Sequence, residues 1–209
     1  AVLGSDAKDE ELKEGMQESE HEAEHEAEHE AEIDEHVWLS IRNAEIFCKE
    51  IARVLSELDA KNADVYSKNA EIYVEKLSKL DSQFQSVISS SANKTLVFGD
   101  RFPFRYLFDD YGLDYFAAFA GCNAESEADF ETITFLATKV DELGLLSVLK
   151  IDGTMHSIAE TVKDNTAEKN QKILTLNSMQ TTTLSDVENG NSYLSIMEEN
   201  LNVIEEALK

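Results

Sequence analysis

Apolar side chains recur with helical spacing through residues 37–91. They fall three or four residues apart, which places them on one face of a helix, and neither Gly nor Pro interrupts residues 64–91. We therefore predict a continuous helix of about 27 residues over this second part, roughly 40 Å long at 1.5 Å per residue. The apolar positions before a break near Asn62 are Ile46, Phe47, Ile51, Val54, Leu55 and Leu58, and those after it are Val65, Ile72, Tyr73, Leu77, Leu80, Phe84, Val87 and Ile88.

A different pattern begins after residue 92, where short apolar runs alternate with helical segments. Continuously apolar strands that alternate with helices are typical of a parallel sheet with helices on both faces. The sequence therefore predicts an α/β fold, in which a long linker helix precedes a small four-stranded parallel-sheet lobe. The predicted strands cover residues 95–98 (ended by Gly99), 115–120, 145–151 and 173–176, and the predicted helices cover residues 102–111, 125–143, 156–166 and 193–208.

Charge and composition narrow the class of partner. The chain has 43 acidic and 18 basic residues and a formal net charge of −25, which disfavours nucleic acid and anionic membranes and attracts cations. Residues 5–35 carry few large apolar side chains, so we expect a mobile, solvated segment there. No apolar stretch is as long as the roughly 18 residues that a membrane-spanning helix needs.

Histidines are concentrated in this acidic segment. His21, His25 and His29 follow one another at four-residue intervals, and His36 lies just beyond them. Neutral imidazole is the commonest zinc ligand in proteins, and carboxylates bind or concentrate the same cations. If the tract is helical, neighbouring histidines share a face and could clamp a zinc ion; if it is disordered, it serves as a local chelator. A solvated low-complexity tether is the alternative, but it does not account for the repeated histidine.

The loops that follow the predicted strands are the second place where a ligand could bind. Asp100 and Asp152 lie in these loops, and His156 begins the helix after the third strand. The loops contain neither a glycine-rich phosphate loop nor a nucleophile elbow. A small metal-dependent lyase or chelatase that uses His156 and strand-end carboxylates is one interpretation, but no acid–base pair at a recognisable spacing supports it. We therefore favour a binding protein over an enzyme.

Several segments together resemble a known family. Residues 34–44 read Asp-Glu-His-Val-Trp-Leu-Ser-Ile-Arg-Asn-Ala, which is similar to the Asp-Pro-His-Val-Trp-Leu-Ser/Asp-Pro-x-Asn-Ala segment of zinc- and manganese-binding receptors of ABC transporters. The likeness continues in order through residues 104–113, 121–127, 176–179 and 193–201. The chain thus resembles the extracytoplasmic solute-binding proteins that have a rigid helix between two lobes.

This resemblance implies a divalent metal, zinc with manganese as the alternative, held between two lobes by four side chains. One family ligand falls on His36. Another, usually His, falls on Arg101, which stays protonated and cannot coordinate a metal. A third falls on Gln180, whose neutral amide is a weaker ligand than a carboxylate. Asp100 and Asp152 are the candidates that could replace the missing ligands.

The resemblance also divides the chain into four parts. Residues 1–35 form an acidic segment that matches the His-rich loop of zinc receptors, and residues 36–63 correspond to a helix that remains from the first lobe. Residues 64–92 are the interlobe helix and residues 93–209 are the C-terminal α/β lobe. Because the sequence starts without Met, we expect a processed product or a part of a longer protein that lacks most of the first lobe.

From the same resemblance we expect an extracytoplasmic receptor, anchored as a lipoprotein in its full-length form, that delivers metal to the permease subunits of an ABC importer. A lobe that keeps the fold but has lost the transport-type site is the alternative. The helix faces that would pack on a first lobe, including Trp38 and Phe47, are expected to be exposed, which favours a homodimer.

Overall fold

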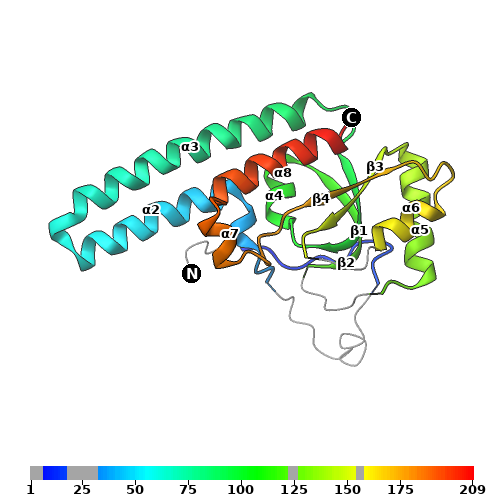
Figure 1. Cartoon of the computed structure of the whole chain (residues 1–209), viewed down its shortest axis with the longest axis horizontal. Helices are drawn as coiled ribbons and strands as arrows, with labels where there is room; N and C mark the ends of the chain where they lie inside the picture. Colours follow the sequence, from blue (N-terminus) through cyan, green and yellow to red (C-terminus); the bar gives the residue numbers. More distant parts are fainter. Residues whose placement is uncertain (1–6, 18–32, 122–126, 154–157) are drawn as a thin grey trace.

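The computed structural model consists of a small α/β lobe and a pair of long helices that extends away from it (Figure 1). It describes residues 7–17, 33–121, 127–153 and 158–209. In these parts of the chain, no helix is both long and apolar enough to cross a membrane.

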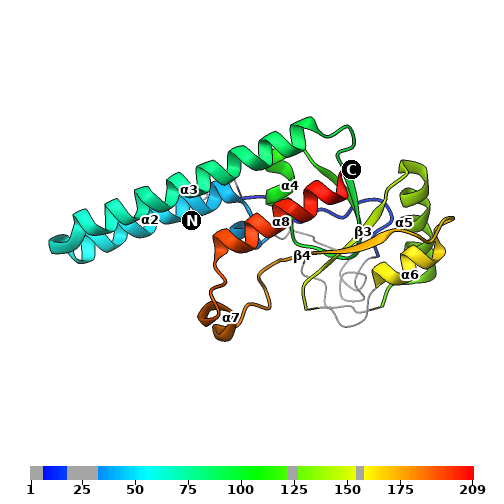
Figure 2. The same ribbon diagram turned by 45° about the horizontal axis from the view of Figure 1, so that its top comes forward.

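The two long helices lie side by side and run in opposite directions (Figures 1 and 2). α2 spans Ile41–Leu58 and α3 spans Ala63–Ser90, and the 3-10 turn η3 at Ala60–Asn62 joins them. α3 continues for 28 residues without a break, as its uninterrupted apolar spacing predicted. The side chains that anchor its second half in the lobe are Leu77, Leu80, Phe84 and Ile88.

The lobe is built on one sheet of four parallel strands in the order β2-β1-β3-β4. This confirms the predicted fold class, with the long helix leading into a parallel-sheet lobe. The strands are β1 (Thr95–Phe102), β2 (Asp114–Ala120), β3 (Ser147–Ile151) and β4 (Lys172–Leu176). The helices of the lobe are α4 (Arg105–Tyr111), α5 (Phe130–Leu143), α6 (Ile158–Asn165), α7 (Leu184–Glu188) and α8 (Tyr193–Ala207).

The two faces of the sheet belong to two separate cores. In β1, Leu96 and Phe98 join the core that α3, α4 and α8 cover, whereas Val97 between them joins the core that α5 and α6 cover. This alternation is the two-residue period of a strand. The helices lie on the two sides of the sheet accordingly (Figure 2), so the predicted coverage of both faces is confirmed.

The helix ends predicted from Gly112 and Gly144 are confirmed, but the strand end predicted from Gly99 is wrong. Gly112 and Gly144 take left-handed φ values of 68° and 62° after α4 and α5, as expected of C-caps. Gly99, in contrast, lies inside β1, which continues to Phe102. A Cβ atom at Gly99 would lie 2.3 Å from the Ala159 Cα of α6. The strand therefore needs glycine there because a helix packs directly on its backbone.

The first described segment, residues 7–17, also differs from the expectation of a mobile segment. The Gln17 backbone N–H donates to the Ala118 carbonyl of β2 over 2.9 Å, and the Asp34 N–H donates to the Lys8 carbonyl over 2.8 Å. A Cβ atom at Gly15 would collide with the Phe135 ring of α5. Residues 7–17 are thus packed on the lobe, while residues 18–32 lie outside the described part of the chain.

Candidate metal site

His36 lies in the turn before α2, next to the end of β2. Its side chain is fully buried, and the 3-10 turn η2 (Val37–Leu39) begins directly after it. A Cβ atom added at Gly121 would lie 3.0 Å from His36 Cε1, so a larger residue there would push the ring away. The sequence therefore places an imidazole at the carboxyl edge of the sheet, which is where ligands bind in open α/β sheets.

A carboxylate two residues earlier sets the orientation and tautomer of this ring. Asp34 is buried, and its Oδ1 lies 2.9 Å from His36 Nδ1 and accepts from the His36 backbone N–H over 2.8 Å. Because a carboxylate accepts hydrogen bonds, this contact places a proton on Nδ1, and in the neutral ring Nε2 then keeps its lone pair. The Tyr106 hydroxyl of α4 donates to the Asp34 carbonyl over 2.9 Å and holds this segment in place.

The side chain of Gln180 lies next to the second ring nitrogen of His36, Nε2. Its Nε2 lies 2.6 Å from His36 Nε2, so the amide donates a hydrogen bond to the lone pair of the imidazole. A metal ion would bind through the same lone pair. Cation binding therefore requires the Gln180 amide to move aside or to turn over and present its oxygen.

Trp38 links the turn that holds His36 to the loop after β4. Its ring centroid lies 5.3 Å from that of His36, and its indole N–H donates to the Ser178 carbonyl over 3.1 Å. Trp38 is half-buried and packs against the lobe core, as Phe47 of α2 is half-buried too. The expectation that these two side chains are exposed is wrong: both are half-buried, and the lobe core covers part of Trp38.

Asp100 does not end a strand but lies within β1, and it ties two strands together. Its Oδ1 accepts from the Arg101 N–H over 2.8 Å and its Oδ2 accepts from the Ile151 N–H over 3.1 Å. The carboxylate is buried with 6% of the residue exposed. Arg101 also lies within β1 and pairs in register with Phe119 of β2.

Asp152 follows β3 and contacts the loop after β4. Its Oδ1 accepts from the Ser178 backbone N–H over 2.5 Å and from Ser178 Oγ over 2.8 Å, and its Oδ2 accepts from the Thr181 hydroxyl. Both oxygens of this predicted metal ligand are thus engaged with the loop that carries Gln180.

Among the described residues, no three His, Cys, Asp or Glu side chains converge into a group that could hold a metal ion. The structure brings His36 and Gln180 together but does not assemble His36, Asp100 and Asp152 into one such group. The remaining predicted ligands, His21, His25 and His29, lie outside the described residues, and so does His156 of the enzyme interpretation.

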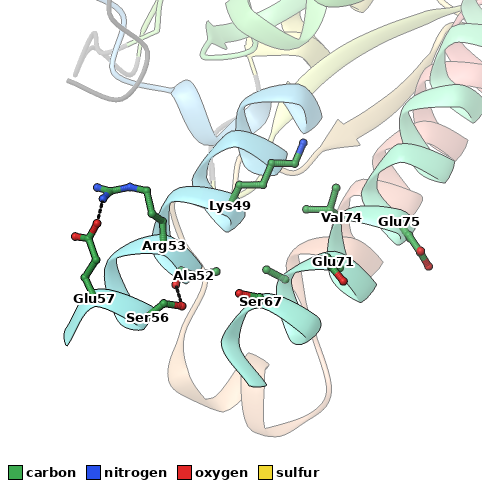
Figure 3. A pocket seen from close by; sticks show the side chains of 10 residues that line it. Lys49, Ala52, Arg53, Ser56, Glu57, Ser67, Glu71, Val74 and Glu75 are labelled. Atoms are coloured by element: carbon green, nitrogen blue, oxygen red, sulfur yellow. Dashed lines mark hydrogen bonds and ion pairs between the residues drawn. The ribbon is translucent and has the colours of Figure 1, made fainter. Parts of the chain in front are cut away.

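A groove of about 720 Å³ lies elsewhere, between the distant parts of α2 and α3 (Figure 3). Lys49, Arg53 and Glu57 line it from α2, and Glu71 and Glu75 line it from α3. It shares no lining residue with the surroundings of His36, so it is separate from the candidate metal site.

Sequence reasoning missed two members of the site. Asp34 was part of the quoted motif but was given no role, although a carboxylate two residues before a candidate ligand is the signal for a partner of its ring. Ser178 carries no comparable signal, because its contacts to Trp38 and Asp152 join segments that are far apart in the sequence.

An α/β lobe with a buried histidine at the carboxyl edge of its sheet is the arrangement of a ligand-binding lobe. Residues 2–207 match the family described as ZnuA, zinc-uptake complex component A, periplasmic. The chain therefore belongs to this family, and the resemblance read from the residues around His36 is confirmed.

Curated relatives carry the names of several metals. The manganese ABC transporter substrate-binding lipoprotein PsaA of Streptococcus pneumoniae is 33% identical over 177 residues, which cover 84% of this chain and 55% of PsaA. The iron ABC transporter substrate-binding lipoprotein MtsA of Streptococcus pyogenes serotype M1 is 32% identical over 178 residues, with 84% and 55% covered. The chain thus spans about half the length of these relatives. Both are named as substrate-binding proteins, which supports the choice of a binding protein over an enzyme.

Solved structures show the same fold. The zinc-bound ZnuA-like domain of AdcA from Streptococcus pneumoniae is 28% identical with a TM-score of 0.69, and the match covers 84% of this chain and 64% of that one. The metal-dependent lipoprotein YcdH from Bacillus subtilis is 26% identical with a TM-score of 0.71 and the same coverage.

Proposed function

We propose that this chain is the metal-receiving lobe of an extracytoplasmic receptor, which binds a zinc-type divalent cation and delivers it to the permease of an ABC importer. The observation that carries the proposal is the buried Asp34–His36 pair. Metal-ligating histidines characteristically donate their second ring N–H to a carboxylate, which fixes the ring and raises its basicity. Asp34 does this for His36, and it leaves Nε2 as the donor atom for a metal.

The proposed ligand set begins with His36 Nε2. The Gln180 oxygen becomes a second, weaker ligand when the amide turns over, since it lies on the same group that now donates to His36. The other coordination positions are filled from outside the described residues. The tract of His21, His25 and His29 captures cations and raises their concentration near this site.

Zinc is the proposed metal and manganese is the alternative, since imidazole with oxygen ligands suits both. The net charge of −25 draws cations toward the chain. Delivery to a permease and anchoring of the full-length protein as a lipoprotein are supported by the names of PsaA and MtsA, which are substrate-binding lipoproteins of ABC transporters.

The proposal is tested by zinc calorimetry on the chain after removal of metal with a chelator. We expect the His36→Ala variant to bind zinc at least tenfold more weakly at the tightest site, because this change removes the one preset imidazole donor.

A variant with alanine at positions 21, 25 and 29 is the matched control. It should lose weak zinc equivalents and keep the tightest one. If His36→Ala leaves the tightest affinity unchanged and the control variant abolishes all binding, the tract alone is the metal site and the proposal is wrong.

A further inference from the structure

The loop after β4, residues 177–181, has an unusual backbone. Met179 adopts a φ of 62°, a left-handed conformation that is unfavourable for any residue with a side chain other than Asn, Asp or Gly. Such a conformation persists only where the surroundings hold it. Within the loop, the Asn177 side-chain oxygen accepts from the Met179 N–H over 2.8 Å.

Three side chains outside the loop hold it. Asn200 of α8 bonds to the backbone N–H and carbonyl of Asn177, the Trp38 indole donates to the Ser178 carbonyl, and Asp152 binds the part next to Gln180. As described above, its carboxylate accepts from two donors of Ser178 and from the Thr181 hydroxyl. The loop after β3 also approaches closely at Gly153, where a Cβ atom would lie 2.4 Å from Thr181 Cγ2. The Asp152 carboxylate thus hydrogen-bonds to the loop on both sides of Gln180.

The conformation of residues 177–181 in turn determines which side-chain group lies next to His36. Ser178 is fully buried, and its Oγ accepts from the Gln180 backbone N–H over 3.3 Å. The Ser178 carbonyl accepts from the Trp38 indole, which comes from the same turn as His36. A continuous path of hydrogen bonds therefore runs from Asp152 through Ser178 to Gln180, whose amide meets His36 Nε2.

We propose that Asp152 is a positioning residue of the metal site and not one of its ligands: it holds residues 177–181 so that the Gln180 side chain faces His36 Nε2. This inference rests on the proposed function for its metal-binding consequence, but its structural part stands on the metal-free chain. It also separates two chemical roles, since a positioning carboxylate needs only its acceptor oxygens whereas a ligand carboxylate needs its charge.

Two substitutions distinguish these roles. Asp152→Ala removes every acceptor, so we expect zinc affinity to fall about tenfold or more, in the range seen when supporting residues of metal sites are removed. Asp152→Asn keeps an oxygen for Ser178 and offers an N–H to the Thr181 hydroxyl, so its affinity should stay within about threefold of the parent chain. In NMR spectra of the metal-free chain, the nuclear Overhauser cross-peak between the Gln180 side-chain amide and the His36 ring should be lost only in Asp152→Ala.

The matched control is Asp141→Ala. The Asp141 carboxylate also holds a loop, accepting from the Ala167 N–H over 3.1 and 3.0 Å, but it lies in the last turn of α5, which leads into the amino end of β3, and so at the other edge of the sheet. It should change neither the cross-peak nor the zinc affinity.

Equal loss of zinc affinity in both Asp152 variants, with the cross-peak intact, would make Asp152 a ligand and overturn the inference. A cross-peak that survives in Asp152→Ala would overturn it as well. If the parent chain binds no zinc, the proposed function fails, and the cross-peak still decides whether Asp152 positions Gln180. Should Asp152→Ala fail to fold, Ser178→Ala tests the same path and should lose the cross-peak.

Discussion

The two halves of the helix pair have opposite surroundings, although their sequences look alike. In the half next to the lobe, Leu77 and Phe84 of α3 are fully buried. In the half that extends away from the lobe, Leu58 is 80% exposed and Val65 is 54% exposed. Both halves carry apolar side chains at helical spacing. The comparison teaches that periodicity identifies an apolar face but does not say what covers it.

The half next to the lobe is also the half that supports the candidate site. Ser40 caps α2 by accepting from the Asn43 N–H, and its hydroxyl donates to Asp110 Oδ2 of α4 over 2.6 Å. The Tyr193 hydroxyl of α8 donates to the Ser40 carbonyl over 3.3 Å. The turn that carries His36 is therefore fixed to two lobe helices, whereas the distant half of the pair touches neither the sheet nor the site.

The structure changes which surface is the candidate for the predicted homodimer. Since Trp38 and Phe47 are half-buried, the exposed apolar side chains of the distant half, such as Ile51 and Leu58, are better candidates for self-association. Self-association stays a prediction.

The largest change in stability should come from truncating a large side chain in the half of the helix pair that is buried against the lobe. Phe84 is fully buried and its ring stacks on Tyr111 at a centroid distance of 5.3 Å, so Phe84→Ala should lower the free energy of unfolding by about 3–5 kcal/mol. Leu58→Ala, in the exposed half, should change it by less than about 0.5 kcal/mol. Chemical denaturation of both variants measures the difference, and similar values for the two would refute the division into halves.

The fold could be read from the sequence because its signals are local. Alternating apolar runs gave four strands and their helices, and Gly112 and Gly144 marked helix ends through their left-handed backbone. Gly99 misled, because its reason is the approach of Ala159 from another element. The short helix α7 was missed, since its five residues bury no side chain that would create an apolar period.

A smaller effect on stability, which depends on pH, is expected at Asp110, where α2 meets α4. Burial raises the pKa of the Asp110 carboxyl above its ordinary value, against the opposing effects of the Ser40 hydroxyl and Arg42. The folded state therefore binds this proton more tightly than the unfolded state, and Asp110 lowers stability as pH rises from below its ordinary pKa through the raised one. Asp110→Asn lacks this penalty. The melting temperature of Asp110→Asn minus that of the parent chain should thus be larger at neutral pH than at pH about 3.

Thermal unfolding across that pH range checks the sign, with Asp164→Asn as an exposed control. A difference between Asp110→Asn and the parent chain that stays constant, or that worsens toward neutral pH, would contradict the stated direction.

The candidate site was less predictable than the fold. His36 was identified from its neighbours in the sequence, and Gln180 from the family resemblance. The sequence could not show that the carboxylates of Asp100 and Asp152 would be engaged by backbone N–H groups of β3 and of the loop after β4. Such partners depend on how the strands align in space. An acidic residue predicted near a strand end is therefore a candidate ligand, but the sequence does not show which groups its carboxylate oxygens contact.

The most direct test of the account is the nitrogen-15 NMR spectrum of the His36 ring in the metal-free chain and after addition of one equivalent of zinc. Before zinc is added, the account predicts a neutral ring that is protonated at Nδ1 and unprotonated at Nε2. After zinc is added, the Nε2 signal should shift while Nδ1 keeps its proton and its hydrogen bond to Asp34. A ring protonated at Nε2, or zinc that binds without moving the Nε2 signal, would contradict it.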